Sequence, residues 1–166
     1  SYVQEHIYKP AGMSDTGFYE PGKETPNLAI GYTSRSDDGK PLEEPRENTN
    51  IREVKGGPAG GGYSTAPDLV KFHQALFNYK LLDKKHTELV TTGKVDGPPG
   101  SRYGYGFGDS TTSGKHIVSH NGGAQGIAAN LDMFPELGYT TVLLMNSDPP
   151  AMMPVIKRIR ERIPAK

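Results

Sequence analysis

Apolar side chains recur at helical spacing in the middle of the chain, at Leu69, Phe72 and Leu76. Thr65 and Asp68 stand three residues apart just before them, as in a helix-capping box, and Pro67 falls in the first turn, where proline is tolerated. The pattern predicts a helix over residues 66–79. A second, shorter helix is expected around residues 83–91.

Both ends of the chain also carry helical patterns. Residues 151–163 place charged side chains on one face and apolar side chains on the other, at Val155, Ile156, Ile159 and Ile163. Residues 1–8 read as the end of a helix, and the following K-P-A-G-M at 9–13 is expected to stop it, because proline cannot continue a helix and glycine suits its exit.

The second half of the chain changes to a strand pattern. Strands are expected at 101–109, at 116–134 with an interruption at the glycines, and at 139–146. The turn P-E-L-G makes the last two an antiparallel hairpin. We therefore expect an α+β fold in which an antiparallel sheet of at least three strands is flanked by the helices at 66–79 and 151–163. The C-terminal helix should pack on one face of this sheet through its apolar side chains.

Residues 14–62 show little periodicity and many Gly, Pro, Asn and Asp residues. A short strand is expected at 28–32 and a turn at 35–41, and the rest reads as a long irregular loop region. Loops of this length in a compact domain are often functional. With 166 residues in all, the chain is expected to form a single domain, 1–166.

Composition excludes several classes of function. Lys plus Arg and Asp plus Glu both number 19, so nothing favours nucleic acid or an anionic membrane as a partner. No apolar run approaches the ~20 residues that span a bilayer. The absence of cysteine excludes disulfides, thiolate metal sites and thiol catalysis.

The first residues carry no initiating Met and no signal peptide, and they look like a helix already under way. We therefore expect a fragment or a processed product. The compartment stays open, and a periplasmic or extracellular parent protein is compatible with the sequence.

Three other motifs are weak candidates for functional sites. The glycine-rich residues 56–62 lack the Gly-Lys-Ser/Thr of a phosphate-binding loop, so they are read as a turn before a helix. G-Y-S-T-A around Ser64 approaches a nucleophile elbow, but no strand precedes it, and Ser64 is read as a residue at the start of the helix. His116 and His120 lie ~13 Å apart along a strand, too far to share a metal ion. The remaining histidines, 6, 73 and 86, are assigned surface or amphipathic roles.

The sequence V-S-H-N-G-G-A-Q-G at 118–126 raises a different question, because His120 is followed by three glycines at the start of a strand. One reading is structural, with the glycines forming a bulge at a sheet edge. The other is that a ligand must approach the backbone closely at this point.

The order of these elements resembles the C-terminal half of the serine β-lactamase and penicillin-binding-protein superfamily, in its class C-like branch. Three segments carry the resemblance: Y-V-Q-E-H-I-Y-K-P-A-G-M, G-G-G-Y-S-T-A-P-D-L-V-K-F-H-Q-A-L, and the segment from His120 through the following hairpin. The resemblance covers nearly the whole chain. It implies a β-lactamase/transpeptidase-like fold, present in part, and a parent enzyme that hydrolyses a β-lactam, a D-Ala peptide or a small ester through a serine acyl-enzyme, without a cofactor or a metal.

The resemblance also implies roles for four residues of the third family motif, K-T-G or H-x-G. His120 stands in the place of the motif's Lys or His, near the substrate carboxylate and the proton network. Asn121 takes the place of Thr or Ser, and Gly122 is the motif glycine. Gly123 would offer its backbone N–H as half of an oxyanion hole. A side chain at Gly122 would block the acyl group along the strand.

The other two family motifs are absent from these residues. No serine is followed by lysine three positions later, and no tyrosine by asparagine two positions later. The chain is therefore expected to be inactive alone. The alternatives are a stand-alone, non-catalytic binding or interaction module with the same half-fold, and a hydrolase that uses Ser64. We also expect self-association, or pairing with the missing N-terminal half, through residues 139–146. A third possibility is that the helix at 151–163 seals that edge.

Overall fold

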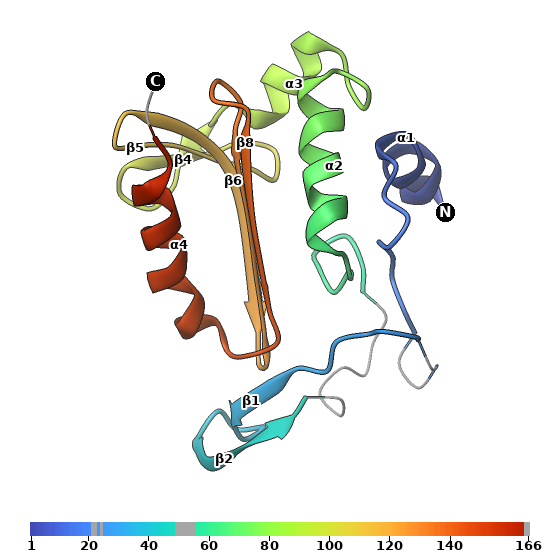
Figure 1. Cartoon of the computed structure of the whole chain (residues 1–166), viewed down its shortest axis with the longest axis vertical. Coiled ribbons are helices and arrows are strands. Elements are labelled where there is room, and N and C mark those ends of the chain that lie inside the picture. The colour runs from blue at the N-terminus through green and yellow to red at the C-terminus, as the bar shows by residue number, and fades with distance from the viewer. Residues whose placement is uncertain (21–22, 24, 49–55, 165–166) are drawn as a thin grey trace.

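Six antiparallel strands form one sheet with a helix on each face (Figure 1). The computed structural model describes residues 1–20, 23, 25–48 and 56–164. The strands are neighbours in chain order and comprise β3 (Val95–Asp96), β4 (Ser101–Tyr103), β5 (Gly108–Thr112), β6 (Lys115–Ala124), β7 (Ile127–Phe134) and β8 (Tyr139–Met145). The α+β class with an antiparallel sheet is therefore confirmed.

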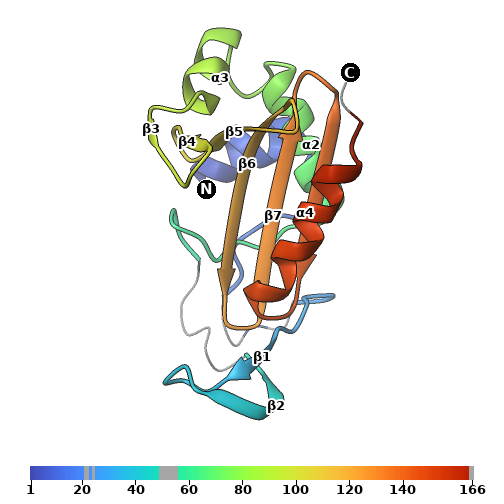
Figure 2. The ribbon, with the colours of Figure 1, turned by 90° about the vertical axis from the view of Figure 1, so that its left-hand side faces the viewer.

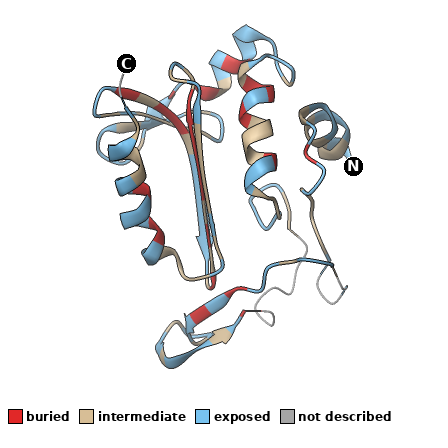
Figure 3. Cartoon of the chain, viewed as in Figure 1, coloured by how far each residue is buried: buried red, intermediate tan, exposed pale blue. Residues whose placement is uncertain are grey.

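The two helices pack on opposite faces of the sheet. Helix α2 (Ala66–Phe77) packs Leu76 against Val118, Leu131 and Met133. On the other face, the 3-10 turn η3 (Pro149–Ala151) leads into α4 (Met152–Arg162), which buries Met152 and Ile156 against Ala128. Figure 3 shows buried residues along the central strands, on the side of α4 that faces them, and on α2.

Strand β6 runs without interruption through the glycines, so the predicted break in this strand is wrong. Its register with β7 is continuous from Val118↔Met133 to Ala124↔Ile127, with no bulge. A loop of two residues, Gln125 and Gly126, joins the strands, and Gly126 takes the left-handed conformation at φ 73°. Only the last of the three glycines is therefore needed by the turn.

The predicted strand at 101–109 is in fact the short hairpin β4–β5. Gly106 lies at φ 87°, which breaks the extended run. A β-carbon at Gly104 would lie 2.6 Å from the carbonyl oxygen of Val90, so this glycine allows the loop to close on helix α3 (Lys84–Thr91). The alternation of glycine and aromatic residues marked a tight turn rather than one strand.

The predicted central helices are confirmed. Thr65 caps α2 by accepting a hydrogen bond from the backbone N–H of Asp68, and Asp83 caps α3 in the same way. The capping box of α2 is only half formed, because the carboxylate of Asp68 binds partners elsewhere in the chain.

The N-terminal helix ends later than expected. A π-helical segment η1 (Gln4–Tyr8) continues into α1 (Lys9–Ala11), so Pro10 lies inside the helical segment. Gly12 ends it in the left-handed conformation, at φ 75°. The glycine, rather than the proline, stops the helix.

The C-terminal helix packs on one sheet face as expected, but with a different set of side chains. Ile156 is buried and Ile159 is half-buried, whereas Val155 is 41% exposed. The buried face begins one turn earlier than predicted, at Met152. Val155 therefore points away from the sheet of this chain.

The irregular first third contains a two-stranded hairpin at one end of the sheet (Figure 2), formed by β1 (Tyr32–Arg35) and β2 (Pro41–Glu47). The expected strand at 28–32 is wrong, because pairing begins at Tyr32, whereas the turn at 35–41 is confirmed as the hairpin connection. The parts of the 14–62 loop at 21–22, 24 and 49–55 lie outside the described residues. In the described part of the chain, no helix is long and apolar enough to cross a membrane.

Candidate active site at the open end of strand β6

The second half of β6 has a neighbouring strand on one side only. Its pairing with β5 ends at Gly108↔Ser119, whereas its pairing with β7 continues to Ala124. Within the described residues no strand covers the other edge of residues 120–124. The segment His120 to Gly123 therefore lies on an open strand edge, and all four residues are exposed.

The register of the hairpin determines which backbone groups face this open edge. Ala124 and Ile127 flank the two-residue loop, so their backbone groups point toward each other across the hairpin. Backbone groups alternate in direction along an antiparallel strand. The N–H groups of Asn121 and Gly123 therefore point away from β7, toward the open edge, as an oxyanion donor at Gly123 requires.

His120 points to the α2 face of the sheet and lines a cavity of about 370 Å³ there. The register places His120 opposite Leu131, which packs against α2. Most of the lining is apolar and comes from the N-terminal helical segment, α2 and the β4–β5 loop, including Ile7, Met13, Leu69, Phe72 and Phe107. The polar side chains of Thr16, Tyr63 and Ser64 lie in the same lining.

The surroundings of Gly123 exclude a side chain, whereas those of Gly122 do not. A β-carbon at Gly123 would lie 2.6 Å from Cγ of Pro149, so packing against η3 by itself demands glycine there. A β-carbon at Gly122 would meet nothing within 4 Å among the described residues, and Gly122 has no left-handed φ. The described chain therefore gives no structural reason for glycine at 122. The open space beside Gly122 lies on the His120 face.

The wall that carries Ser64 is held together by one buried carboxylate. Asp68 is fully buried, and its Oδ2 accepts hydrogen bonds from the backbone N–H of Asp15 (2.7 Å) and the hydroxyl of Thr16 (2.8 Å). Its Oδ1 accepts from Lys71 Nζ at 2.8 Å. Burial works against ionisation of Asp68, but these bonds prevail and lower its pKa. Asp68 thereby ties residues 15–16 to the start of α2.

Ser64 lies in the same cavity lining as His120 but has the bonding of a structural residue. Its hydroxyl is 2.8 Å from the hydroxyl of Thr16 and donates weakly to the carbonyl of Thr65. An isolated bridge, Gly17↔Tyr63, precedes it in place of the strand that a nucleophile elbow requires. The Ser64 hydroxyl thus contacts the hydroxyl of Thr16 and the carbonyl of Thr65. Neither group is a general base of the His or Lys type that would activate a serine.

The other histidines lie away from this cavity. His116 is 3.0 Å from Asp109 through Nε2 and 3.0 Å from Glu136 through Nδ1. His73 was expected on the surface or on an amphipathic face, but it is buried against Phe77 and its Nδ1 contacts the hydroxyl of Thr140. Burial lowers the pKa of His73. Its position on the inner face of α2 could have been read from its spacing of four from Leu69.

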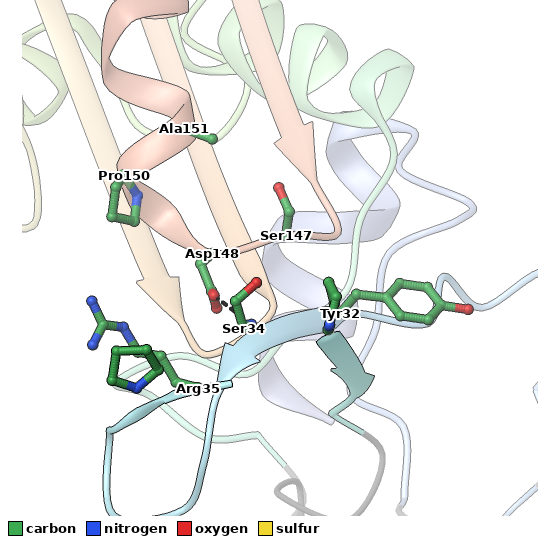
Figure 4. A pocket seen from close by; sticks show the side chains of 9 residues that line it. Tyr32, Ser34, Arg35, Ser147, Asp148, Pro150 and Ala151 are labelled. Atoms are coloured by element: carbon green, nitrogen blue, oxygen red, sulfur yellow. Dashed lines mark hydrogen bonds between the residues drawn. The ribbon is translucent and has the colours of Figure 1, made fainter. Parts of the chain in front are cut away.

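A second cavity, of about 450 Å³, lies between the β1–β2 hairpin and the start of α4 (Figure 4) and contains none of the four motif residues. Asp148 lines this cavity and accepts hydrogen bonds from the backbone N–H groups of Ser34 (2.9 Å) and Gly126 (2.8 Å). These bonds fasten the hairpin to the turn after β6. This cavity is larger, but its one carboxylate, Asp148, is already used in holding the fold together.

Comparison with known proteins agrees with this fold. The sequence model of the family described as Beta-lactamase matches residues 1–165. A Bacillus subtilis (strain 168) protein described as "Putative penicillin-binding protein PbpX" is 34% identical over 146 residues, covering 88% of this chain and 34% of that protein. The crystal structure of a penicillin binding protein from Bacillus halodurans superposes with a TM-score of 0.82 at 26% identity, over 95% of this chain and 48% of that one.

More distant structures show the same fold. D-amino acid amidase from Ochrobactrum anthropi SV3 superposes with a TM-score of 0.75 at 24% identity, over 96% of this chain and 51% of that one. A class C beta-lactamase superposes with a TM-score of 0.69 at 14% identity. The fold is thus that of the β-lactamase and transpeptidase class.

The chain belongs to the Beta-lactamase family, and it corresponds to the C-terminal half of the domain that characterises this superfamily. It spans about one third of the length of the Bacillus subtilis relative and about half of the Bacillus halodurans one.

Proposed function

We propose that residues 120–123 form one wall of an acyl-transfer site in a serine hydrolase. The observation that carries the proposal is the open space beside Gly122, on the face of His120 and next to an outward-pointing N–H at Gly123. A carbonyl group can approach such an edge closely, and its developing negative charge would meet a backbone donor fixed by the sheet.

Each residue of this wall has a distinct part in the proposed reaction. The N–H of Gly123 supplies one of two hydrogen bonds to the oxyanion, and packing against Pro149 fixes its direction. Gly122 leaves room for the acyl group. His120 faces the cavity, where it acts on the substrate carboxylate and in proton transfer, and Asn121 offers an amide at the substrate-facing edge.

The nucleophile is expected from a polypeptide segment outside these 166 residues. Acyl-enzyme formation needs a serine with an adjacent base, and the S-x-x-K and Y-x-N motifs are absent from this sequence. Such a segment could precede Ser1 in the same gene product or belong to a separate chain. The 166-residue chain alone is therefore proposed to be inactive.

The substrate class is an acyl compound with a carboxylate near the scissile bond: a β-lactam, a D-Ala peptide or a small ester. Relatives named as a penicillin-binding protein and as a D-amino acid amidase are compatible with lactam, peptide and amide substrates. No residue of the described site selects among them.

The test compares the 166-residue chain with a longer product that contains an S-x-x-K segment, using nitrocefin and p-nitrophenyl esters. The chain alone should show no turnover, and the longer product should hydrolyse at least one substrate. Ser64→Ala serves as the control and should change nothing. Turnover by the short chain that Ser64→Ala abolishes would instead establish Ser64 as the nucleophile.

We further propose that β8 is the surface through which the chain pairs with its N-terminal half or with a second copy. β8 is the last strand of the sheet, and none of its seven residues is buried, although Val142, Leu143, Leu144 and Met145 are apolar. Helix α4 covers the face of β8 that carries Leu143 and Met145. Leu144 points to the opposite face and is 41% exposed. An open apolar edge is a template for another strand. This surface is also what the alternative, a non-catalytic interaction module, would use.

A further inference from the structure

Asn130, in the middle of β7, carries a buried acceptor without a partner. Its side chain is only 3% exposed, and among the described residues its Oδ1 accepts no hydrogen bond. Leaving such an atom unpaired is unfavourable, because its lost hydration is not replaced by another hydrogen bond. An unpaired amide oxygen at this depth therefore calls for a donor.

The side chains around Asn130 leave few donors within reach. On the α4 face of the sheet, its neighbours along β7 are Ala128 and Asp132. Across β8 it faces Leu143. Arg160 of α4 also lies on this face, and its Nε and Nη2 are both bonded to Asp132.

On its remaining side Asn130 lies directly opposite Asn121 of the third motif. Counting back from the hydrogen-bonded pair Ala124↔Ile127, the pair Asn121↔Asn130 is a non-hydrogen-bonded one. Side chains approach most closely in such pairs, with β-carbons ~4.5–5.5 Å apart. The exposed amide of Asn121 can therefore reach the buried oxygen by rotation of its side chain.

We propose that Asn130 is a positioning residue for Asn121, accepting a hydrogen bond at Oδ1 from Asn121 Nδ2. The bond satisfies the buried oxygen and directs the remaining N–H and the Oδ1 of Asn121 outward along the open edge. Its catalytic significance rests on the proposed function, whereas the bond itself is a property of the hairpin.

The bond is tested first in the 166-residue chain by NMR, through hydrogen exchange of the Asn121 side-chain amide, assigned with Asn121→Ala. We expect exchange at least about five-fold slower than in an unstructured asparagine peptide, the factor for one net hydrogen bond. Asn130→Leu should abolish the protection. Leu143→Val, which perturbs the other neighbour of Asn130, should leave it unchanged.

Exchange at the peptide rate in the wild-type chain would overturn the proposal, and this readout does not depend on whether Asn130→Leu folds. Protection that survives Asn130→Leu in a folded chain would overturn it as well.

The second test is a double-mutant cycle in the longer product with a p-nitrophenyl ester. Asn130→Leu should lower kcat/KM, and the double variant with Asn121→Ala should be no worse than Asn121→Ala alone, because Asn130 acts through Asn121. If the losses in kcat/KM from Asn130→Leu and Asn121→Ala were additive, Asn130 would not act through Asn121. If the wild-type product hydrolyses nothing, the proposed function fails, while the exchange measurement still decides the hydrogen bond.

Discussion

Arg160 donates two hydrogen bonds of 2.7 Å to the buried carboxylate of Asp132, from Nε to Oδ2 and from Nη2 to Oδ1. This pair joins the last turn of α4 to the second half of β7, and it raises the pKa of Arg160. Arg160→Ala leaves a buried charge without its partner, so we expect unfolding in urea to become easier by about 3–5 kcal/mol.

Arg158→Ala is the matched control on the same helix. Arg158 is mostly exposed, and its Nη1 lies 3.6 Å from Oε2 of Glu161. Its removal should therefore lower the free energy of unfolding by less than about 1 kcal/mol. If the two substitutions lowered the free energy of unfolding equally, the Arg160–Asp132 pair would not be what holds α4 on the sheet.

The two motif glycines are expected to respond differently to alanine. Gly123→Ala drives a methyl group into Pro149 and should destabilise the 166-residue chain by about 1–3 kcal/mol. Gly122→Ala meets open space and should leave stability unchanged or slightly raised. In the longer product, however, Gly122→Ala should abolish hydrolysis. A folded, fully active Gly122→Ala product would refute the role assigned to that space.

The buried His73 makes stability depend on pH. Burial holds its folded-state pKa below the unfolded value of about 6.5, so the unfolded chain binds a proton more readily. Stability should therefore be fully present above about pH 6.5 and fall toward pH 5, with a slope of at most about 1.4 kcal/mol per pH unit from this group.

Thermal unfolding between pH 5 and 8 measures this contribution in the wild type and in His73→Asn. His73→Asn should make stability depend less on pH. His6→Asn changes a histidine at an exposed position and should not alter the pH dependence of stability. A slope unchanged by His73→Asn would assign the pH dependence to other groups.

The β8 edge predicts concentration-dependent association of the short chain. Light scattering at micromolar concentration should show species larger than 18.0 kDa. Leu144→Lys places a charge at the edge and should shift the chain toward the monomer. A wild-type chain that stays at 18.0 kDa, with residues 139–146 protected from hydrogen exchange, would exclude pairing through this strand.

Much of the fold could be predicted from local patterns. The helix at Thr65 and the hairpin around P-E-L-G follow from capping and turn residues that act within a few positions of each other. The glycine-rich segments led to wrong strand predictions in two places, because the roles of these glycines depend on contacts distant in sequence. Gly104 lies against the carbonyl of Val90, and Gly123 lies against the ring of Pro149. Neither contact can be seen in sequence spacing.

The candidate site was predictable only in part. The segment at His120 was found from its residues and its family resemblance. Its open edge follows from where β5 begins, at Gly108, which depends on the turn at Gly106. The Asp68 network joins residues 52 and 53 positions apart, so its partners Thr16 and Asp15 could not be found from the capping motif that contains Asp68.

The most direct test of the account is the location of the acyl group after reaction with a slowly hydrolysed acylating agent, such as a fluorescent penicillin. Intact-mass and peptide mass spectrometry would be applied to the 166-residue chain and to the longer product. We predict no adduct on the short chain, and in the longer product one adduct on the serine of S-x-x-K, outside residues 1–166. An adduct on Ser64 in either protein would contradict the assignment of residues 120–123 as one wall of a site completed from elsewhere.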